Sequence, residues 1–181
     1  MVAAGNDPTV EVKDRIPAGY PEVMAIAGTT AALGSDDGSA SCSIFPHVAA
    51  DTASWFTTDG RFDPDTRVGV TISAPGEDRE DIVHSQDECA LQSVGLEVLS
   101  KGGGLTRDAG TSISSPHVAG VVARMKEQAA ALGTTLFLET ARYNIRSTAN
   151  RLLDVPLDST HESYTFDGER EGIVWTPGAL Q

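Results

Sequence analysis

Positive charge is scarce in this sequence. Only 13 of the 181 residues are basic, three of them lysines, against 26 aspartates and glutamates, and the formal net charge at pH 7 is -13. Proteins that bind nucleic acid neutralise phosphates with clustered lysine and arginine side chains. A duplex or polyphosphate partner is therefore excluded. The hydrophobic fraction of 40% is that of an ordinary globular domain and argues against disorder.

Long hydrophobic runs and a recognisable export signal are also lacking. No apolar stretch approaches the ~20 residues that a membrane-spanning helix needs. The first residues, Met1 to Asp7, contain neither the basic region nor the apolar region of a signal peptide. The sequence therefore indicates no membrane partner and contains no recognisable targeting signal.

Cysteine is nearly absent, with Cys42 and Cys89 as the only two. A bond between them would close a long loop and contribute roughly 3–4 kcal/mol in an oxidising compartment. Two free thiols fit the sequence equally well, and no metal-ligand spacing surrounds either residue. Both interpretations stay open.

The hydrophobic pattern predicts an α/β fold. Short apolar runs at 22–29 and 68–73, bounded by glycine and proline, are typical of buried strands. Apolar residues recur at helical spacing over 112–132 and again over 138–149, and Gly133 follows the first of these as a C-terminal cap. Strands and helices joined by short links indicate α/β layering.

Two further segments are less regular. The strongly charged stretch 77–88 predicts an exposed loop, and an Asp-Gly turn near the C-terminus predicts a small hairpin over 164–175.

A serine-rich segment opens the longer predicted helix. Backbone N–H groups and the positive end of the helix dipole would stabilise an anion that develops beside a serine there. Alternatively, Ser115 is only an N-cap, with Pro116 at the first helical position. Spacing alone does not choose a reactive serine. The segment reads Gly110-Thr111-Ser112-Ile113-Ser114-Ser115-Pro116-His117-Val118-Ala119-Gly120.

A second polar patch stands at the start of the chain. Apolar residues from Val2 lead into Gly5 and Asn6, as in a strand that ends at a tight turn. Asparagine is a common turn former. Its side-chain amide can also donate to a developing oxyanion.

Together the two patches resemble the subtilisin-like (subtilase, peptidase S8) serine proteases. Residues 110–120 match the nucleophile motif of that family, and Ala3-Ala4-Gly5-Asn6 resembles its oxyanion-hole segment. Tyr20–Ala27 and Ser73–Gly76 resemble its two intervening strand blocks, and 53–56 is a weaker match. These blocks follow the family order over about residues 1–150, leaving 151–181 as a C-terminal hairpin and tail of one partial catalytic domain.

The resemblance implies a three-layer α/β fold with a mostly parallel central sheet, incomplete because the N-terminal part is absent. It implies a serine endopeptidase that cleaves polypeptides through an acyl-enzyme, with Ser112 as nucleophile and with the Ser112 N–H and Asn6 amide as oxyanion donors. Ala3, Ala4 and Gly5 would line the pocket for the residue before the scissile bond. Asp7 at its rim would favour a basic or polar side chain there.

No base for Ser112 is evident. His117 follows it by five residues, about 140° round a helix, and is interpreted as a packing residue. His47, His84 and His161 are interpreted as surface-loop residues. The Asp and His motifs of the family lie upstream of the oxyanion segment, so an upstream segment carrying them is expected. The chain alone is then expected to be unstable and inactive.

Other interpretations remain. A catalytically inactive subtilase-like binding or partner module is the main alternative, whereas a lipase or esterase is disfavoured because no Gly-x-Ser-x-Gly elbow occurs. Segment 77–109 either shapes substrate access or decorates the surface. The resemblance implies an extracellular location and no cofactor; a structural calcium is compatible with the family, but no site is assigned. Thr71 stands where a carboxylate would help, and Asp59, Asp63 and Asp65 fit a solvated turn rather than an EF-hand.

Overall fold

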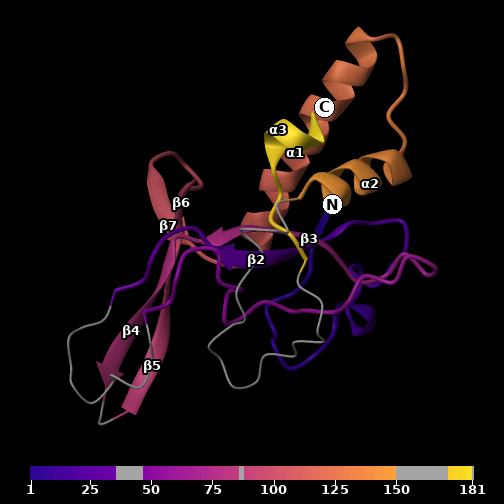
Figure 1. Cartoon of the computed structure of the whole chain (residues 1–181). Helices are drawn as coiled ribbons and strands as arrows, with labels where there is room; N and C mark the ends of the chain where they lie inside the picture. The colour runs from indigo at the N-terminus through magenta and orange to yellow at the C-terminus, as the bar shows by residue number, and fades with distance from the viewer. Residues whose placement is uncertain (36–46, 86–87, 150–170, 181) are drawn as a thin grey trace.

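The computed structural model describes residues 1–35, 47–85, 88–149 and 171–180. Its centre is a parallel sheet of β1 (Val2–Ala3), β2 (Ala25–Thr30) and β3 (Val70–Glu77), in the order β1-β2-β3 (Figure 1). Ala25 pairs with Val2 on one side and Val70 on the other. The predicted strands and the α/β class are confirmed.

Helices cover one face of this sheet. They are α1 (Thr111–Ala131), α2 (Leu138–Thr148) and the short α3 (Thr176–Ala179) (Figure 1). Side chains alternate along β2 and the residue before it, so that Met24 and Ile26 pack in the helix-side core while Ala25 and Ala27 face the opposite cluster. The helix-side core consists of Met24, Ile26, Ile72, Ala74, Val118, Val121, Val122, Met125, Ala141, Ile145, Ala149 and Ala179.

Loops cover the other face. The 3-10 turn η1 (Val12–Asp14) inserts Val12, which is fully buried, beside Ala4, Ala18, Ala25, Ala27 and Val70. Near the C-terminus, Gly172 accepts a hydrogen bond of 3.0 Å from the Ser73 N–H, and the Val174 N–H donates to the Ser73 carbonyl at 2.9 Å. This stretch therefore lies along β3. The other half of the predicted hairpin, 164–166, lies outside the described residues.

Both helix predictions are confirmed in position, but the start of α1 differs from the N-cap alternative. The helix begins at Thr111 after Gly110, and Pro116 lies inside it. Because proline lacks an N–H, the Ser112 carbonyl has no i+4 donor within the helix. At the other end Gly133 has φ +68° and its N–H bonds to the Ala130 carbonyl at 3.0 Å, as a C-terminal cap requires.

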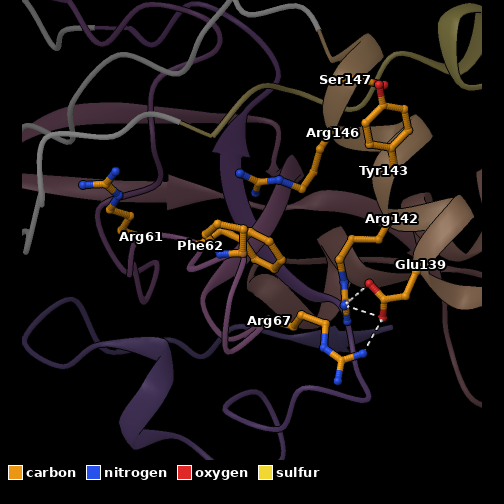
Figure 2. A pocket seen from close by; sticks show the side chains of 9 residues that line it. Arg61, Phe62, Arg67, Glu139, Arg142, Tyr143, Arg146 and Ser147 are labelled. Atoms are coloured by element: carbon orange, nitrogen blue, oxygen red, sulfur yellow. Dashed lines mark hydrogen bonds and ion pairs between the residues drawn. The ribbon is translucent and has the colours of Figure 1, made fainter.

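Arginines anchor α2 to the rest of the fold (Figure 2). The Arg142 side chain is 3% exposed and donates to the carbonyls of Pro21 and Val23, both at 2.8 Å, while pairing with Glu139. Arg142 and Arg146 lie over the Phe62 ring, with guanidinium carbons 5.6 and 4.1 Å from its centroid. A cavity of about 530 Å³ beside them is lined by α2 and the loop before β3. These contacts hold the helix in place.

Two antiparallel hairpins connect β3 to α1. The first is β4 (Arg79–Ser85) with β5 (Glu88–Val94), and the second is β6 (Leu96–Leu99) with β7 (Leu105–Asp108). Figure 1 shows the first hairpin extending away from the sheet. The prediction of an exposed loop over 77–88 was therefore wrong.

The charges of that segment are accommodated by pairing and burial. Arg79 pairs with Asp78 at 3.1 Å and with Asp81 at 3.0 Å. Glu77 and Glu80 are fully buried, and the Trp55 N–H donates to Glu80 at 2.6 Å. Burial raises the pKa of Glu77. Burial, together with the adjacent Glu77 carboxyl, raises the pKa of Glu80 to about 9.

Cys42 and His161 lie outside the described residues. Cys89 is disulfide-bonded, so the alternative of two free thiols is wrong. No helix in the described part of the chain is long and apolar enough to cross a membrane.

Candidate active site

The sheet brings the end of β1 to the start of α1. Asn6 follows β1, and its Oδ1 accepts from the Thr111 N–H at 2.9 Å and from the Thr111 hydroxyl at 2.8 Å. The Gly5 N–H donates to Thr111 Oγ1 at 3.2 Å. The two patches singled out in the sequence, 105 residues apart, are thus joined by three hydrogen bonds. Because Oδ1 is held by Thr111, the orientation of the Asn6 amide is fixed.

Gly110 separates the donor end of that amide from Ser112. Its backbone has φ +147° and ψ 162°, a region that is essentially restricted to glycine. A Cβ at this position would lie 2.8 Å from Asn6 Nδ2 and 3.2 Å from Ser112 Oγ. Both polar atoms therefore face one small space, and glycine keeps it open.

The three serines of the cluster differ in exposure. Ser112 is exposed in the first turn of α1, whereas Ser114 is completely buried and Ser115 is partly buried. The N–H groups of Thr111, Ile113 and Ser114 have acceptors. Among the described residues none accepts from the Ser112 N–H, which remains available beside the hydroxyl at the positive end of the helix.

Glycines within β2 and β3 allow α1 to approach this closely. The Gly110 N–H donates to the Gly76 carbonyl at 2.9 Å. A Cβ at Gly76 would lie 2.7 Å from Ser114 Oγ, and one at Gly28 would lie 3.5 Å from it. The buried Ser114 therefore packs into a recess between the two strands. That packing sets the position of Ser112 two residues earlier.

A cavity of about 460 Å³ adjoins Asn6. Its lining contains all the predicted pocket residues, Ala3, Ala4, Gly5 and Asp7, together with Asn6, Pro8, Arg15, Ile16 and Ala18. Arg15 was missed by the sequence reasoning. No periodicity or motif marks it, because it reaches Asp7 across a loop.

Asp7 is held at the rim by its own neighbours. Thr9 donates to Oδ1 with its N–H at 3.1 Å and with its hydroxyl at 2.6 Å, and Arg15 pairs with Oδ2. Hydrogen bonds from Thr9, followed by the charge of Arg15, hold the pKa of this carboxyl below its usual range. Thr58 fixes the backbone of Asp7, accepting its N–H at 3.2 Å and donating to its carbonyl at 2.9 Å.

Three of the four histidines fall within the described ranges. His117 Nδ1 lies 3.1 Å from the Pro75 carbonyl, so its ring is turned toward β3. His47 is exposed in a loop, as expected, whereas His84 lies on strand β4 rather than in a loop.

The aspartates considered for calcium are not gathered into one cluster. Asp59 is buried, whereas Asp63 is exposed and accepts from the Asp65 N–H at 2.8 Å and the Thr66 hydroxyl at 2.9 Å. In the described ranges no group of three or more histidine, cysteine or acidic side chains could hold a metal ion.

The sequence profile of the subtilase family matches residues 1–166. The chain belongs to the subtilase family. No curated protein sequence matches it. The subtilase assignment agrees with the resemblance carried by residues 3–6 and 110–120.

Solved subtilase structures share the fold. A cold-adapted subtilisin-like serine proteinase is 20% identical with a TM-score of 0.57, covering 97% of this chain and 44% of that one. The self-cleaved protease domain of PatA is 22% identical with a TM-score of 0.54, covering 98% and 47%. The prenylagaramide maturation protease PagA is 19% identical with a TM-score of 0.57, covering 98% and 48%. The chain thus spans less than half the length of each.

Proposed function

We propose that this chain supplies the nucleophile and the oxyanion-binding groups of a serine endopeptidase, with Ser112 as the nucleophile. Membership of the subtilase family supplies the reaction class, a serine peptidase acting on polypeptides. The assignment of residues rests on the two hydrogen bonds that Thr111 donates to Asn6 Oδ1. They hold the amide donor and the Ser112 hydroxyl around the same space beside Gly110.

In the proposed reaction, Ser112 Oγ attacks the scissile carbonyl and its proton passes to a base. The carbonyl oxygen becomes an oxyanion, which accepts hydrogen bonds from the Ser112 N–H and from Asn6 Nδ2. Collapse of the tetrahedral intermediate expels the amine and leaves an acyl group on Ser112, which water then removes. The cavity beside Asn6 would receive the side chain of the residue before the cut.

The base and its orienting carboxylate are proposed to come from the Asp and His segments of the family, outside these 181 residues. A serine hydroxyl is a weak nucleophile without such a base. The placement of His117 against Pro75 supports this division, because the ring is engaged with β3. An extracellular location is likewise proposed from the family alone, and fractionation of a culture tests it.

A fluorophosphonate probe tests the proposal. The protein expressed from its complete gene should be labelled, Ser112→Ala should not be, and Ser115→Ala should retain labelling because Ser115 lies one turn further along α1. Labelling that survives Ser112→Ala would rule out Ser112 as nucleophile. A folded protein that is never labelled would support the alternative, a catalytically inactive binding module.

A further inference from the structure

Among the described residues, one cation lines the cavity beside Asn6. Most of the lining is small or apolar, and its charged members are Asp7 and Arg15. The Arg15 stem packs against Gly5, since a Cβ on Gly5 would lie 3.8 Å from Arg15 Cγ. Arg15 is therefore part of the same wall that leads into Asn6.

The carboxylate of Asp7 has little left to offer a ligand. Oδ1 already accepts two hydrogen bonds from Thr9, and Oδ2 accepts the guanidinium of Arg15. A lysine or arginine side chain entering the cavity would have to displace Arg15 from Asp7 and would meet a like charge while doing so.

The guanidinium of Arg15 has donors to spare. It carries five N–H groups, and its hydrogen bond to Asp7 uses NH2. Its Nε is buried and has no acceptor among the described residues. The donors that a ligand in the cavity can meet are therefore on the terminal nitrogens, which carry four N–H groups, whereas the hydrogen bond to Asp7 uses NH2 alone. The backbone of Arg15 is held on both sides, by the Val12 carbonyl at 3.0 Å and by the Gly19 N–H at 2.6 Å.

We propose that Arg15 determines the specificity of this pocket and selects glutamate as the residue before the scissile bond. A carboxylate matches the fork of guanidinium donors better than any other side chain, and a cavity of about 460 Å³ has room for it beside the Asp7 pair. This inference rests on the proposed function. It is the opposite of the preference for a basic side chain that is expected from Asp7 alone.

The test uses p-nitroanilide peptides that differ only in the residue before the cut, with the protein expressed from its complete gene. Glutamate should exceed glutamine and lysine in kcat/KM by at least about tenfold, because a site built to hydrogen-bond one side chain rejects analogues that leave its donors unpaired. Arg15→Gln should abolish that order, and Arg15→Lys should preserve glutamate over lysine. Leucine at the same position should be cleaved comparably by all three proteins.

Two further variants separate specificity from structure. Asp7→Asn should raise kcat/KM for the glutamate peptide, because it frees Arg15. If Asp7 determined the preference instead, this variant would lose activity toward the lysine peptide. Arg124→Gln, an exposed arginine paired with Glu127 on α1, should leave the preference unchanged. A protein labelled at Ser112 that favours lysine, or an unaltered profile in Arg15→Gln, would overturn this inference alone. Absence of Ser112 labelling would overturn the proposed function and this inference with it.

Discussion

Replacing Gly110 with alanine should inactivate the candidate site with little change elsewhere. The new Cβ would lie 2.8 Å from Asn6 Nδ2 and 3.2 Å from Ser112 Oγ, and both distances are shorter than an ordinary van der Waals contact. One of the two polar atoms must move by some tenths of an ångström. Asn6 is clamped through Oδ1, so its amide cannot swing away without losing the bonds from Thr111.

The magnitude follows from the donor that is displaced. Loss of an oxyanion-hole amide lowers kcat by about 10²–10³, a figure measured in subtilisin itself and therefore carried over from the same family. Alanine at φ +147° and ψ 162° also costs on the order of 1–3 kcal/mol of stability. We therefore expect kcat for a peptide substrate to fall by about a hundredfold or more, and the melting temperature to fall as well.

Gly103→Ala is the matched control. Gly103 also has a positive φ, +98°, but a Cβ there would meet nothing within 4 Å. It therefore reproduces backbone strain without the clash. Kinetics of both variants, with melting curves to show that each is folded, separate the two effects. A Gly110→Ala protein that is folded and retains wild-type kcat would refute the account of the space between Asn6 and Ser112.

Three other changes follow from the same contacts. Thr111→Val removes one of the two bonds to Asn6 and should lower kcat about two- to tenfold with little change in KM, measured by steady-state kinetics. The pKa of Glu80 is raised to about 9 in the folded protein, so the free energy of unfolding should fall as pH rises from about 4.5 toward 9. The slope should be on the order of 1 kcal/mol per pH unit. In denaturant titrations Glu80→Gln should flatten this slope and be more stable than the wild type at pH 8. Arg142→Met leaves the Pro21 and Val23 carbonyls without their donor and should lower the free energy of unfolding by about 3 kcal/mol in denaturant titrations. Replacing the exposed Arg67 with methionine should lower it little. Equal losses would contradict the anchoring of α2.

Sequence periodicity predicted the elements that bury a face. The recurrence of Val118, Val121, Val122 and Met125 gave α1, and these residues do pack on the sheet. The apolar runs of β2 and β3 were identified for the same reason. Local pattern thus reports burial wherever the burying residues are apolar.

Burial of charge was not predictable in that way. Glu77 and Glu80 lie in a charged stretch, and only the folded hairpin shows that both side chains are enclosed and that Trp55 donates to one of them. The helix start was misplaced in the N-cap alternative for a related reason. Pro116 usually marks a first turn, but here the helix begins five residues earlier.

The candidate site was predicted as two separate segments. The family resemblance paired residues 3–6 with 110–120, and the structure joins them through Thr111 and Asn6. Arg15 could not be found from the sequence, since its pairing with Asp7 depends on the path of the intervening loop. Which serine is accessible also required the packing of Ser114 against Gly28 and Gly76.

Mapping the fluorophosphonate adduct by mass spectrometry identifies the nucleophile. The protein expressed from its complete gene is labelled and digested, and the modified residue is located in the peptide that spans the start of α1. We expect a single adduct on Ser112 that disappears when the protein is denatured before labelling. An adduct on Ser114, on Ser115 or outside this segment, or a folded protein with no adduct, would contradict this expectation.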